Sequence, residues 1–331
     1  MPLPTGRASY PTRRALLAAT AGAVGLASAG CSDGRFWTDA TGRIRLGTGN
    51  PGAVFDEYGG ALARAARRVM PAVRVSVRNT RGSVDNVRRI DGGTVEVGFC
   101  LGDTADLALR GRSPFAATQD LVALARLYDS FLQVVVRDDS PVTEAAQLRG
   151  RRVAVGEQGS GTVLTVTRTL RAAGVRLQEV RMEHPSLATG LSRLAEGTID
   201  ALCFVSGFPI RSLVDLAATT PLRVLDLGGL VPALVERYGP QYVAGPLPAR
   251  PYRLAESVQT VSVKTHLVAA PSLPDDLAAG LTAVVFDEQQ RIARLVPEVR
   301  QPTAAAAIFT EPLALHPGSL RYFRQRDRAG S

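Results

Sequence analysis

The stretch VAVGEQGSGTVLTVTRTLRAAGV, from Val153 to Val175, joins a short apolar run to a glycine-rich turn and then to a helical pattern. A strand that leads through a glycine loop into a helix is the repeating unit of α/β folds. Such loops hold phosphates, other anions or nucleophilic serines. The stretch therefore predicts an α/β architecture and a candidate site at its glycine loop.

Two of these chemistries do not fit the loop. A Walker loop carries a lysine after its second glycine, and none is present here. A nucleophile elbow needs glycine where Gln158 stands, and His184, His266 and His316 lie in no partner motif, so we expect surface or turn histidines. Two interpretations remain: backbone N–H groups of Ser160 to Thr162 bind an anion at a helix start, or the glycines only form a tight turn.

A second glycine pattern precedes the first. Gly47, Gly49 and Gly52 match the spacing G-x-G-x-x-G between a strand and a helix. A dinucleotide fold would need an acidic residue about 20 positions later, at the end of the next strand, where the sequence reads Asn-Thr-Arg from position 79. The missing acid and the proline inside the loop argue against a nicotinamide-dependent enzyme.

The same alternation of strands and helices continues along the chain, as in a doubly wound α/β lobe. Leu62, Ala65, Ala66 and Val69 have helical spacing, and residues 121–140 form one unusually long extended run that can cross between two lobes. We expect strands near 43–47, 73–80, 95–100, 199–207 and 258–270, and helices near 54–70, 82–91, 103–110, 185–196 and, as one long amphipathic helix, 274–295. Two such units predict a cleft between lobes.

Composition excludes one class of partner. The formal charge is +9, but residues 1–30 contribute three arginines and no acid, which leaves +6 for residues 31–331. The remaining arginines form no basic run, and only 5% of residues are aromatic, so we expect no nucleic-acid binding. Cys100 and Cys203 each follow an apolar strand-like run; we expect two buried thiols, with a disulfide as the alternative.

The first thirty residues resemble an export signal. The pair Arg13-Arg14 precedes an apolar stretch that is shorter than the roughly 20 residues of a membrane span, in the order typical of twin-arginine signals. The sequence Ser-Ala-Gly-Cys ending at Cys31 is similar to a lipobox, although Ser28 stands where leucine is usual. We expect lipidation of Cys31 and an extracytoplasmic, membrane-anchored domain; cleavage after Ala29 by the ordinary signal peptidase is the alternative.

Several segments together resemble the TAXI family of extracytoplasmic solute-binding proteins, which serve TRAP-type transporters. They occur in the family's order and cover nearly all of residues 44–324. The segments are LGTGNPGAVFDEYGGALA, TRGSVDNVRRIDGG, VGFCLGDTADLA, LARLYDSFLQVVVRDDS, LRGRRVAVGEQGSGT, GTIDALCFVSGFP and LHPGSLRYF. The glycine loop before Thr162 is thus one part of an ordered set.

The resemblance implies a two-lobed α/β protein of the type II periplasmic-binding class that closes on a small carboxylate, such as glutamate or a related organic acid. A membrane permease driven by an ion gradient would receive this solute. We expect a monomer with no catalytic residue, cofactor or metal; the alternative is a lipoprotein that presents its closed form to a membrane receptor. The expected parts are the signal 1–30, a spacer 31–42, lobe 1 from 43–133, lobe 2 from 134–243, and a return to lobe 1 with the C-terminal helices in 244–331.

The resemblance also implies site residues. On one wall of the cleft it places Thr48, Gly49, Asn50, Val54, Phe55, Asp56, Ser83, Asn86 and Asp103; near the hinge, Tyr128; and on the other wall, Gly159, Ser160, Gly161, Thr162, Gly207 and Pro209. Helix-start amides and hydroxyls suit a carboxylate, and Arg126 could add a clamp if it points inward.

One departure from the family pattern concerns the first loop. Where paired tyrosines are common, this chain has Phe55 followed by Asp56. If Asp56 faces the cleft, its carboxylate favours a cationic group in the ligand. The sequence therefore predicts an amine-bearing or zwitterionic solute in preference to a simple dicarboxylate.

Overall fold

The computed structural model describes residues 35–297 and 299–330. Phe36–Ser331 is one compact unit. The expected export signal, the lipidation of Cys31 and the first residues of the spacer lie outside the described residues. No helix of the described part is long and apolar enough to cross a membrane.

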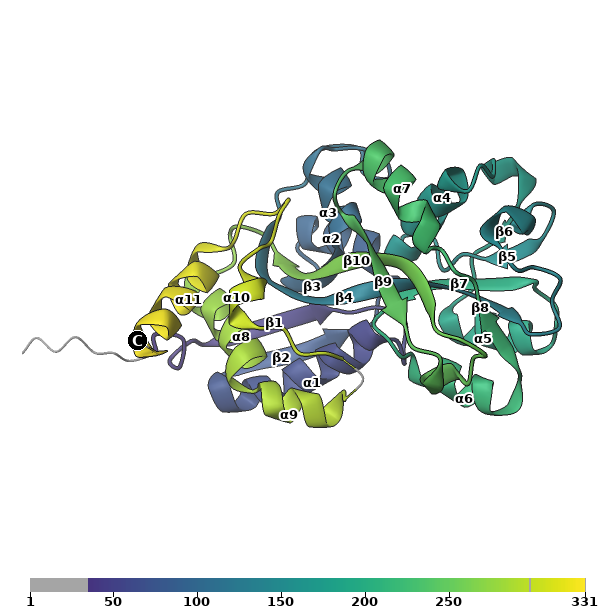
Figure 1. Ribbon diagram of the computed structural model, residues 1–331. Coiled ribbons are helices and arrows are strands. Elements are labelled where there is room, and N and C mark those ends of the chain that lie inside the picture. Colours follow the sequence, from purple (N-terminus) through teal and green to yellow (C-terminus); the bar gives the residue numbers. More distant parts are fainter. Residues whose placement is uncertain (1–34, 298, 331) are drawn as a thin grey trace, which may run out of the picture. The chain divides into compact units, whose positions relative to one another are not determined.

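A mixed sheet of ten strands organises the described residues (Figure 1). Its main path runs β2-β1-β3-β10-β4-β7-β5-β6, while β8 pairs with β4 and β9 pairs with β10. The strands are β1 (Gly42–Gly47), β2 (Val73–Arg78), β3 (Val97–Leu101), β4 (Val122–Arg137), β5 (Arg152–Ala154), β6 (Arg181–Glu183), β7 (Ala201–Ser206), β8 (Leu222–Val224), β9 (Tyr242–Leu247) and β10 (Val258–Ala269).

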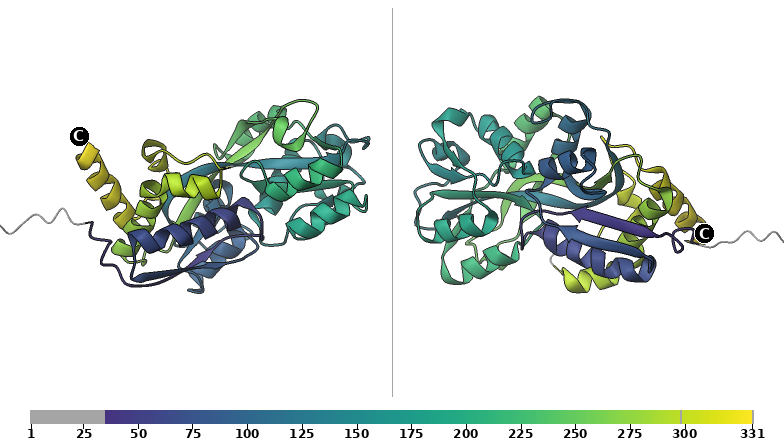
Figure 2. Two further views of the ribbon diagram at one scale, coloured as in Figure 1. Left: turned by 90° about the horizontal axis from the view of Figure 1, so that it is seen from below. Right: turned by 180° about the vertical axis from the view of Figure 1, so that it is seen from behind.

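Helices connect the parallel strands and cover the sheet, as crossover connections require. They are α1 (Val54–Val69), α2 (Ser83–Asp91), α3 (Gly102–Leu109), α4 (Gly161–Ala172), α5 (Leu187–Ala195), α6 (Arg211–Thr219), α7 (Val231–Tyr238), α8 (Asp275–Asp287), α9 (Gln289–Leu295), α10 (Ala304–Ala307) and α11 (Pro317–Gly330), with 3₁₀ turns at Ala145–Leu148, Leu177–Glu179, Gly228–Leu230 and Arg250–Tyr252. Helices α8 and α11 pack together, and α1 packs against α8 and α9 (Figure 2).

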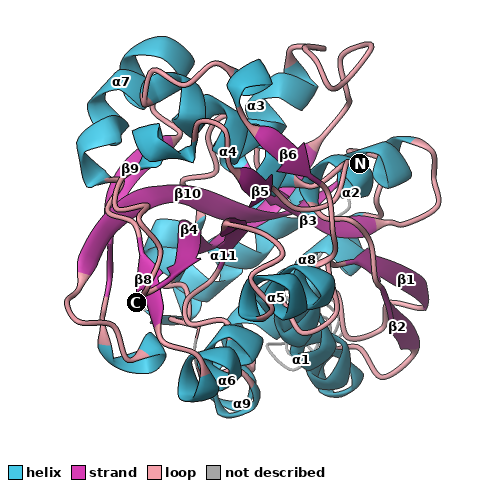
Figure 3. Cartoon of the chain, turned by 90° about the vertical axis from the view of Figure 1, so that its right-hand side faces the viewer, coloured by secondary structure: helices cyan, strands magenta, loops and turns pink. Residues whose placement is uncertain are grey.

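We name two parts of this sheet lobe 1 and lobe 2, after the two lobes expected from sequence. Lobe 1 contains β1 to β3, where β1 pairs in parallel with both neighbours, together with α1 to α3 and α8 to α11; lobe 2 contains β5 to β9 and α4 to α7. Strand β4 joins them, because it pairs with β10 at one end and with β7 and β8 at the other. Strand β10 likewise pairs with β3, β4 and β9, and it crosses the centre of Figure 3.

This architecture confirms the predicted α/β fold with a mixed sheet and flanking helices. The long extended run is β4, a single strand of 16 residues that contains positions 133 and 134, and β9 contains 243 and 244. The lobe boundaries expected at those positions therefore fall inside continuous strands. These boundaries stay a prediction of where the two lobes move relative to each other, and they do not mark breaks in the secondary structure.

The apolar patterns account for the core. Helix α1 buries Leu62, Ala65, Ala66 and Val69, as their helical spacing predicts. Strand β3 is buried along its whole length, which is typical of a strand covered on both faces. Cys100 and Cys203 are separate buried thiols, in agreement with the expectation from sequence.

Two expectations were wrong. The long helix expected over 274–295 is two helices, α8 and α9, which meet at Glu288 with φ −105° and ψ 16°. Helix α8 is buried from Leu277 to Phe286, so it is a core helix and not an amphipathic one. His266 in β10 and His316 before α11 are buried, not at the surface, whereas His184 is exposed as expected.

Candidate functional site

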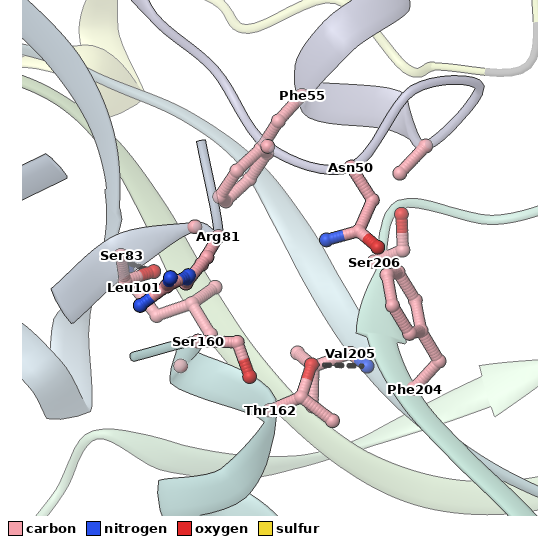
Figure 4. Close-up of a pocket in the computed structure, with 14 residues that line it drawn as sticks. Asn50, Phe55, Arg81, Ser83, Leu101, Ser160, Thr162, Phe204, Val205 and Ser206 are labelled. Carbon is pink, nitrogen blue, oxygen red and sulfur yellow. Dashed lines mark hydrogen bonds between the residues drawn. The ribbon is translucent and has the colours of Figure 1, made fainter. Parts of the chain in front are cut away.

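A small cavity lies where three helices of the two lobes begin, and we name it the first cavity (Figure 4). Its volume is about 30 Å³, enough for little more than ordered water. The lining residues are Gly49, Asn50, Ala53, Phe55, Arg81, Gly82, Ser83, Leu101, Ser160, Gly161, Thr162, Phe204, Val205 and Ser206. They come from the loops and helix starts after β1, β2 and β5 and from the last residues of β3 and β7, which is the edge where α/β folds bind ligands.

The helix starts present backbone donors to this cavity. Ser160 is the N-cap of α4, and its Oγ accepts a hydrogen bond from the Val163 amide at 3.4 Å. The amides of Gly161, Thr162 and Ser83, which open α4 and α2, donate to no other group in the described part of the chain. Free amides at helix N-termini, with the helix dipoles behind them, form a site for a negatively charged group.

Arg81 adds a full positive charge to the same cavity. It precedes α2, it is exposed, and its backbone amide donates to Asp85 Oδ2 at 3.1 Å. No acidic side chain among residues 35–297 and 299–330 forms an ion pair with its guanidinium. Its aliphatic part lies against Gly159 of lobe 2, so the charge stands at the junction of the lobes. A guanidinium without a partner suits a carboxylate or another oxyanion.

Close packing between the lobes depends on glycine. Gly82 has φ +110°, and its Cα side faces Ser160 of the other lobe, with Ser160 Cα 3.7 Å from where a Cβ would stand. Gly161 is tighter still, because an added Cβ would be 2.7 Å from Leu101 Cδ1 and 2.8 Å from Ser83 Oγ. The amides of α2 and α4 can therefore approach one ligand from opposite sides only while these positions lack side chains.

Direct hydrogen bonds also cross between the lobes around the cavity. Asn50 Oδ1 accepts from the Leu187 amide at 2.9 Å, and Ser206 Oγ accepts from the Val54 amide at 3.4 Å. The Asp85 amide donates to the Gly159 carbonyl at 2.9 Å. These contacts and the small volume describe a closed arrangement of the two lobes, so a solute larger than water requires them to separate.

Seven of the residues predicted from sequence line this cavity together. They are Gly49, Asn50, Phe55, Ser83, Ser160, Gly161 and Thr162. Phe55 forms an aromatic wall and stacks on Phe99, with ring centroids 5.1 Å apart. Thr162 Oγ1 accepts a hydrogen bond from the Val205 amide at 3.2 Å, so the hydroxyl proton of Thr162 points away from that amide. The structure thus brings the two predicted walls into one place.

Other predicted residues lie behind the lining. Asn86 is buried, donates to the carbonyls of Thr48 and Phe99 at 2.8 Å each, and accepts from Thr80 Oγ1 at 2.7 Å. Thr48 is also buried and donates to the Arg78 carbonyl at 3.2 Å. These side chains hold β1, β3 and α2 in register, which positions the loops of the cavity.

Asp103 lies in a buried network between α3 and α4. Its Oδ2 accepts from Thr165 Oγ1 at 2.7 Å and from the Tyr242 hydroxyl at 2.9 Å, and Tyr242 accepts from Arg168 at 2.8 Å. Burial raises the pKa of Asp103, while the charge of Arg168 and the two hydroxyl bonds oppose that rise. The network links the lobes, and all of its side chains lie outside the lining of the first cavity.

The remaining predicted residues are also placed outside this lining. Asp56 accepts from Asn79 Nδ2 at 2.6 Å and from the Gly52 amide at 3.2 Å. The Val54 side chain contacts Gly207, Gly159 contributes its carbonyl to the lobe contact, and Pro209 follows a cis peptide bond. Tyr128, Gly207 and Arg126 line a different and larger cavity on the hinge strands.

Sequence reasoning missed half of the lining. The missed residues are Ala53, Arg81, Gly82, Leu101, Phe204, Val205 and Ser206. Arg81 and Gly82 stand directly before the predicted turn at Ser83, so the glycine before a helix start was a usable signal. Phe204 to Ser206 end a buried strand, and the rule that ligands bind at the carboxyl ends of strands could have identified them.

The lining residues of the described chain contain no acidic group. No group of three or more His, Cys, Asp or Glu side chains suited to a metal occurs in the described residues. The cavity's chemistry is therefore that of backbone amides, hydroxyls, one amide side chain, one guanidinium and aromatic rings. Such a set binds an oxyanion next to an apolar body.

Comparisons with known proteins agree with this fold. A protein from Bordetella bronchiseptica RB50 is 14% identical, covers 87% of this chain and 98% of its own, and has a TM-score of 0.56. The alkanesulfonate-binding protein SsuA from Xanthomonas axonopodis pv. citri, bound to MOPS, is 15% identical over 87% of this chain and 84% of its own, with a TM-score of 0.49. The periplasmic aliphatic sulphonate binding protein SsuA from Escherichia coli is 16% identical over 86% and 78%, with a TM-score of 0.45.

At 14% identity the likeness to the Bordetella bronchiseptica protein is one of fold alone. The family of this chain is shown by its sequence. The model of the NMT1-like family matches residues 46–326, which include every strand except the start of β1 and all the helix starts around the first cavity. The chain belongs to the NMT1-like family.

Proposed function

We propose that this protein is an exported solute-binding protein that captures a small carboxylate-bearing solute between its two lobes. The observation that carries the proposal is the first cavity, where the amides of Ser83, Gly161 and Thr162 meet the guanidinium of Arg81, all without partners in the described part of the chain. These donors come from both lobes, so one carboxylate can bind to both at once. Binding then favours the closed arrangement over the open one.

The lining of the first cavity favours a simple organic acid over an amino acid as the solute. The expectation of an amine-bearing solute depended on Asp56 facing the cleft, and that condition is not met, because Asp56 is bonded to Asn79 and Gly52 outside the lining. Asp103 is likewise bonded to Thr165 and Tyr242. Without an acidic group among the described lining residues, an ammonium would lack a charged partner while it lay near Arg81.

The proposal extends to membrane delivery. The ordered segments that resemble the TAXI family support a role with a TRAP-type permease driven by an ion gradient. The resemblance of residues 1–30 to a twin-arginine signal and of Cys31 to a lipobox cysteine supports export and a lipid anchor. In this role the protein performs no catalytic step; closure of the lobes captures the solute and presents it to the permease.

The test of solute binding is a thermal-unfolding screen of the full chain at low ionic strength. We expect succinate to raise the melting temperature by on the order of 5 °C at 100 times its dissociation constant, where binding adds about 2.7 kcal/mol. At the same concentration as succinate, glutamate should raise the melting temperature less, and the neutral diamide succinamide should not raise it. A larger effect of the diamide than of the acids, or no effect of any small carboxylate or sulfonate, would contradict anion capture.

The test of anchoring uses the variant Cys31→Ser. In cells that carry the unmodified chain, the protein should fractionate with the membrane and incorporate labelled palmitate, because a thioether-linked lipid requires the cysteine. The variant should be found in the soluble extracytoplasmic fraction, and replacement of Ser28 by Leu should leave anchoring intact. Membrane fractionation that is unchanged by Cys31→Ser would contradict the lipid anchor without affecting solute binding.

A further inference from the structure

A larger cavity lies on the hinge strands, and we name it the hinge cavity. Its volume is about 530 Å³, within the range typical of small-molecule sites. Four segments form it: residues 126–131 of β4, Gly207 and Phe208 after β7, residues 243–246 of β9 with Ser262 of β10, and residues 299–306, which lead into α10 beside β4. Figure 1 shows β9, β10 and β4 next to one another at this position.

Both lobes contribute to the hinge cavity. Gly207 and Phe208 belong to lobe 2, and the Phe208 ring meets Tyr252 of the same lobe edge to face at 5.1 Å. The segment 299–306 belongs to lobe 1, since Tyr58 of α1 donates to Gln301 Oε1 at 3.2 Å. A molecule in this cavity would therefore touch both lobes and the strands that connect them.

Two residues that line this cavity carry a buried hydroxyl with no hydrogen-bond partner in the described chain. They are the Tyr128 hydroxyl and Ser262 Oγ, whose residues are 6% and 2% exposed. Burial raises the pKa of Tyr128, so its hydroxyl keeps its proton and remains a donor at physiological pH. Buried polar groups in proteins normally have partners, so two unpartnered donors in residues of one lining are available to a ligand whose acceptor atoms reach them.

The charged groups around the cavity leave one cation unpaired among the described residues. Arg126 forms an ion pair with Asp129 at 2.9 Å, and Glu57 of the neighbouring helix α1 pairs with Arg211 at 3.6 Å. Arg300, on the lobe 1 side, is exposed and has no acidic partner in the described residues. Among the described lining residues, the excess charge is therefore positive.

The other walls are apolar. Leu127, Phe131, Phe208, Val243, Pro246 and Val299 line it, and Val243 is 47% exposed although it stands beside the buried hinge. An exposed valine on a concave apolar wall leaves surface that a ligand can bury. A body of aromatic or branched carbon fits these walls, and an acid group fits Arg300.

We propose that the hinge cavity is a second binding site, for a small amphipathic organic anion. Its apolar body packs between Phe131 and Phe208, its acid group pairs with Arg300, and acceptor atoms receive the hydroxyls of Tyr128 and Ser262. Because both lobes and the hinge strands contact the same molecule, occupancy of this site changes the free-energy difference between the open and closed arrangements. The two cavities are then coupled, and the coupling is reciprocal.

The probes are 4-phenylbutyrate and 4-phenylbutylamine, which share an apolar body and differ in the sign of their charge. In calorimetric titration of the full chain we expect one molecule of the acid to bind and the amine to bind at least roughly tenfold more weakly. Arg300→Gln should weaken binding of the acid roughly tenfold, whereas Arg67→Gln, an exposed arginine late in α1, should not change it.

A second pair of variants tests the position of the site. Ala244→Trp introduces a large ring from an exposed strand position of the lining and should abolish binding of 4-phenylbutyrate; Ala306→Phe, on α10, should do the same if the tryptophan variant fails to fold. Gly60→Ala, in α1, where an added Cβ meets only Arg64 at 3.5 Å, should leave it intact. Equal binding of acid and amine, binding that survives both ring-inserting variants, or equal loss of binding in Gly60→Ala would each overturn the proposal, as would no binding of the acid at millimolar concentration. None of these outcomes depends on whether succinate binds the first cavity.

Discussion

The two cavities of this protein obtain their polarity from different sources. The first cavity uses the backbone: amides at the starts of α2 and α4, with hydroxyls and one arginine around them. The hinge cavity uses side chains that stand on β4, β10 and the segment before α10. A site made of helix starts is small and fixed by the fold, whereas a site made of side chains on strands is larger and can change by substitution.

The two cavities also respond differently to closure. The first is bounded by hydrogen bonds between the lobes, including Asn50 to Leu187 at 2.9 Å, and it has about 30 Å³ of space. The hinge cavity has about 530 Å³ in the same arrangement of lobes. We conclude that the first cavity suits capture by closure, and the hinge cavity suits a ligand that binds to the closed form.

The largest expected effect comes from filling the first cavity. In Gly161→Val the new side chain would meet Leu101 and Ser83, so we expect succinate binding to weaken by roughly 100-fold or more, measured by calorimetry. The control is Gly60→Ala in α1, where an added Cβ meets only Arg64 at 3.5 Å and binding should not change. Normal succinate affinity in Gly161→Val would show that the solute binds elsewhere.

A smaller effect should follow removal of the cation. Arg81→Gln keeps a hydrogen-bonding side chain but loses the charge, and we expect roughly tenfold weaker succinate binding, with a lower sensitivity to salt. Arg67→Gln makes the same chemical change far from the cavity and should bind as the unmodified chain does. If both variants lost affinity equally, the charge would act through the general field of the protein and not as a ligand contact.

A matched pair of helix caps separates stability from binding. Ser160 caps α4 and Ser186 caps α5, each accepting from the amide three residues later, at 3.4 and 3.3 Å. Replacement of either serine by alanine should lower the free energy of unfolding by about 1 kcal/mol in urea titrations. Only Ser160→Ala should also weaken succinate binding, by a few fold, because only Ser160 lines the first cavity. Equal succinate binding by the two variants would show that Ser160 acts only as a helix cap.

The smallest effect concerns pH and the network behind the first cavity. Burial raises the pKa of Asp103 above its ordinary value near 4, so the folded protein retains this proton at pH values where the unfolded chain has lost it. The stability that Asp103 contributes is therefore complete below about pH 4 and decreases as pH rises through the folded pKa. We expect Asp103→Asn to gain stability relative to the unmodified chain as pH rises from 4 to 7, in urea titrations. The exposed Asp120→Asn is the control, and a relative loss over that range would contradict the sign.

Sequence predicted the parts of the site that depend on local structure. The glycine loop from Gly159 to Thr162 is a helix start because glycine permits its backbone, with φ +92° at Gly159, and because Ser160 caps the helix. The apolar spacing of α1 and the length of β4 were also readable, since both follow from periodicity. These features need only a few neighbouring residues.

Other residues could not be assigned in this way. Asn86 and Asp103 have the side chains of ligand-binding residues, but their partners Phe99, Thr165 and Tyr242 come from distant elements and bury them in the scaffold. Phe204 to Ser206 look like an ordinary buried strand until β7 is placed beside β4 and β5. The assignment of these polar groups depends on contacts that sequence spacing does not encode.

Local sequence was enough to specify the βα units and the helix start at Ser160, whose amides suit an anion. Which donors meet was decided by tertiary contacts, because these brought Arg81, Ser83 and Gly161 together from two lobes and placed Asp56 outside the cavity. The two kinds of feature differ in the range of the interactions that fix them. Helix caps and glycine turns are fixed by hydrogen bonds within a few residues, whereas a binding site is fixed by packing between segments that lie far apart in the chain.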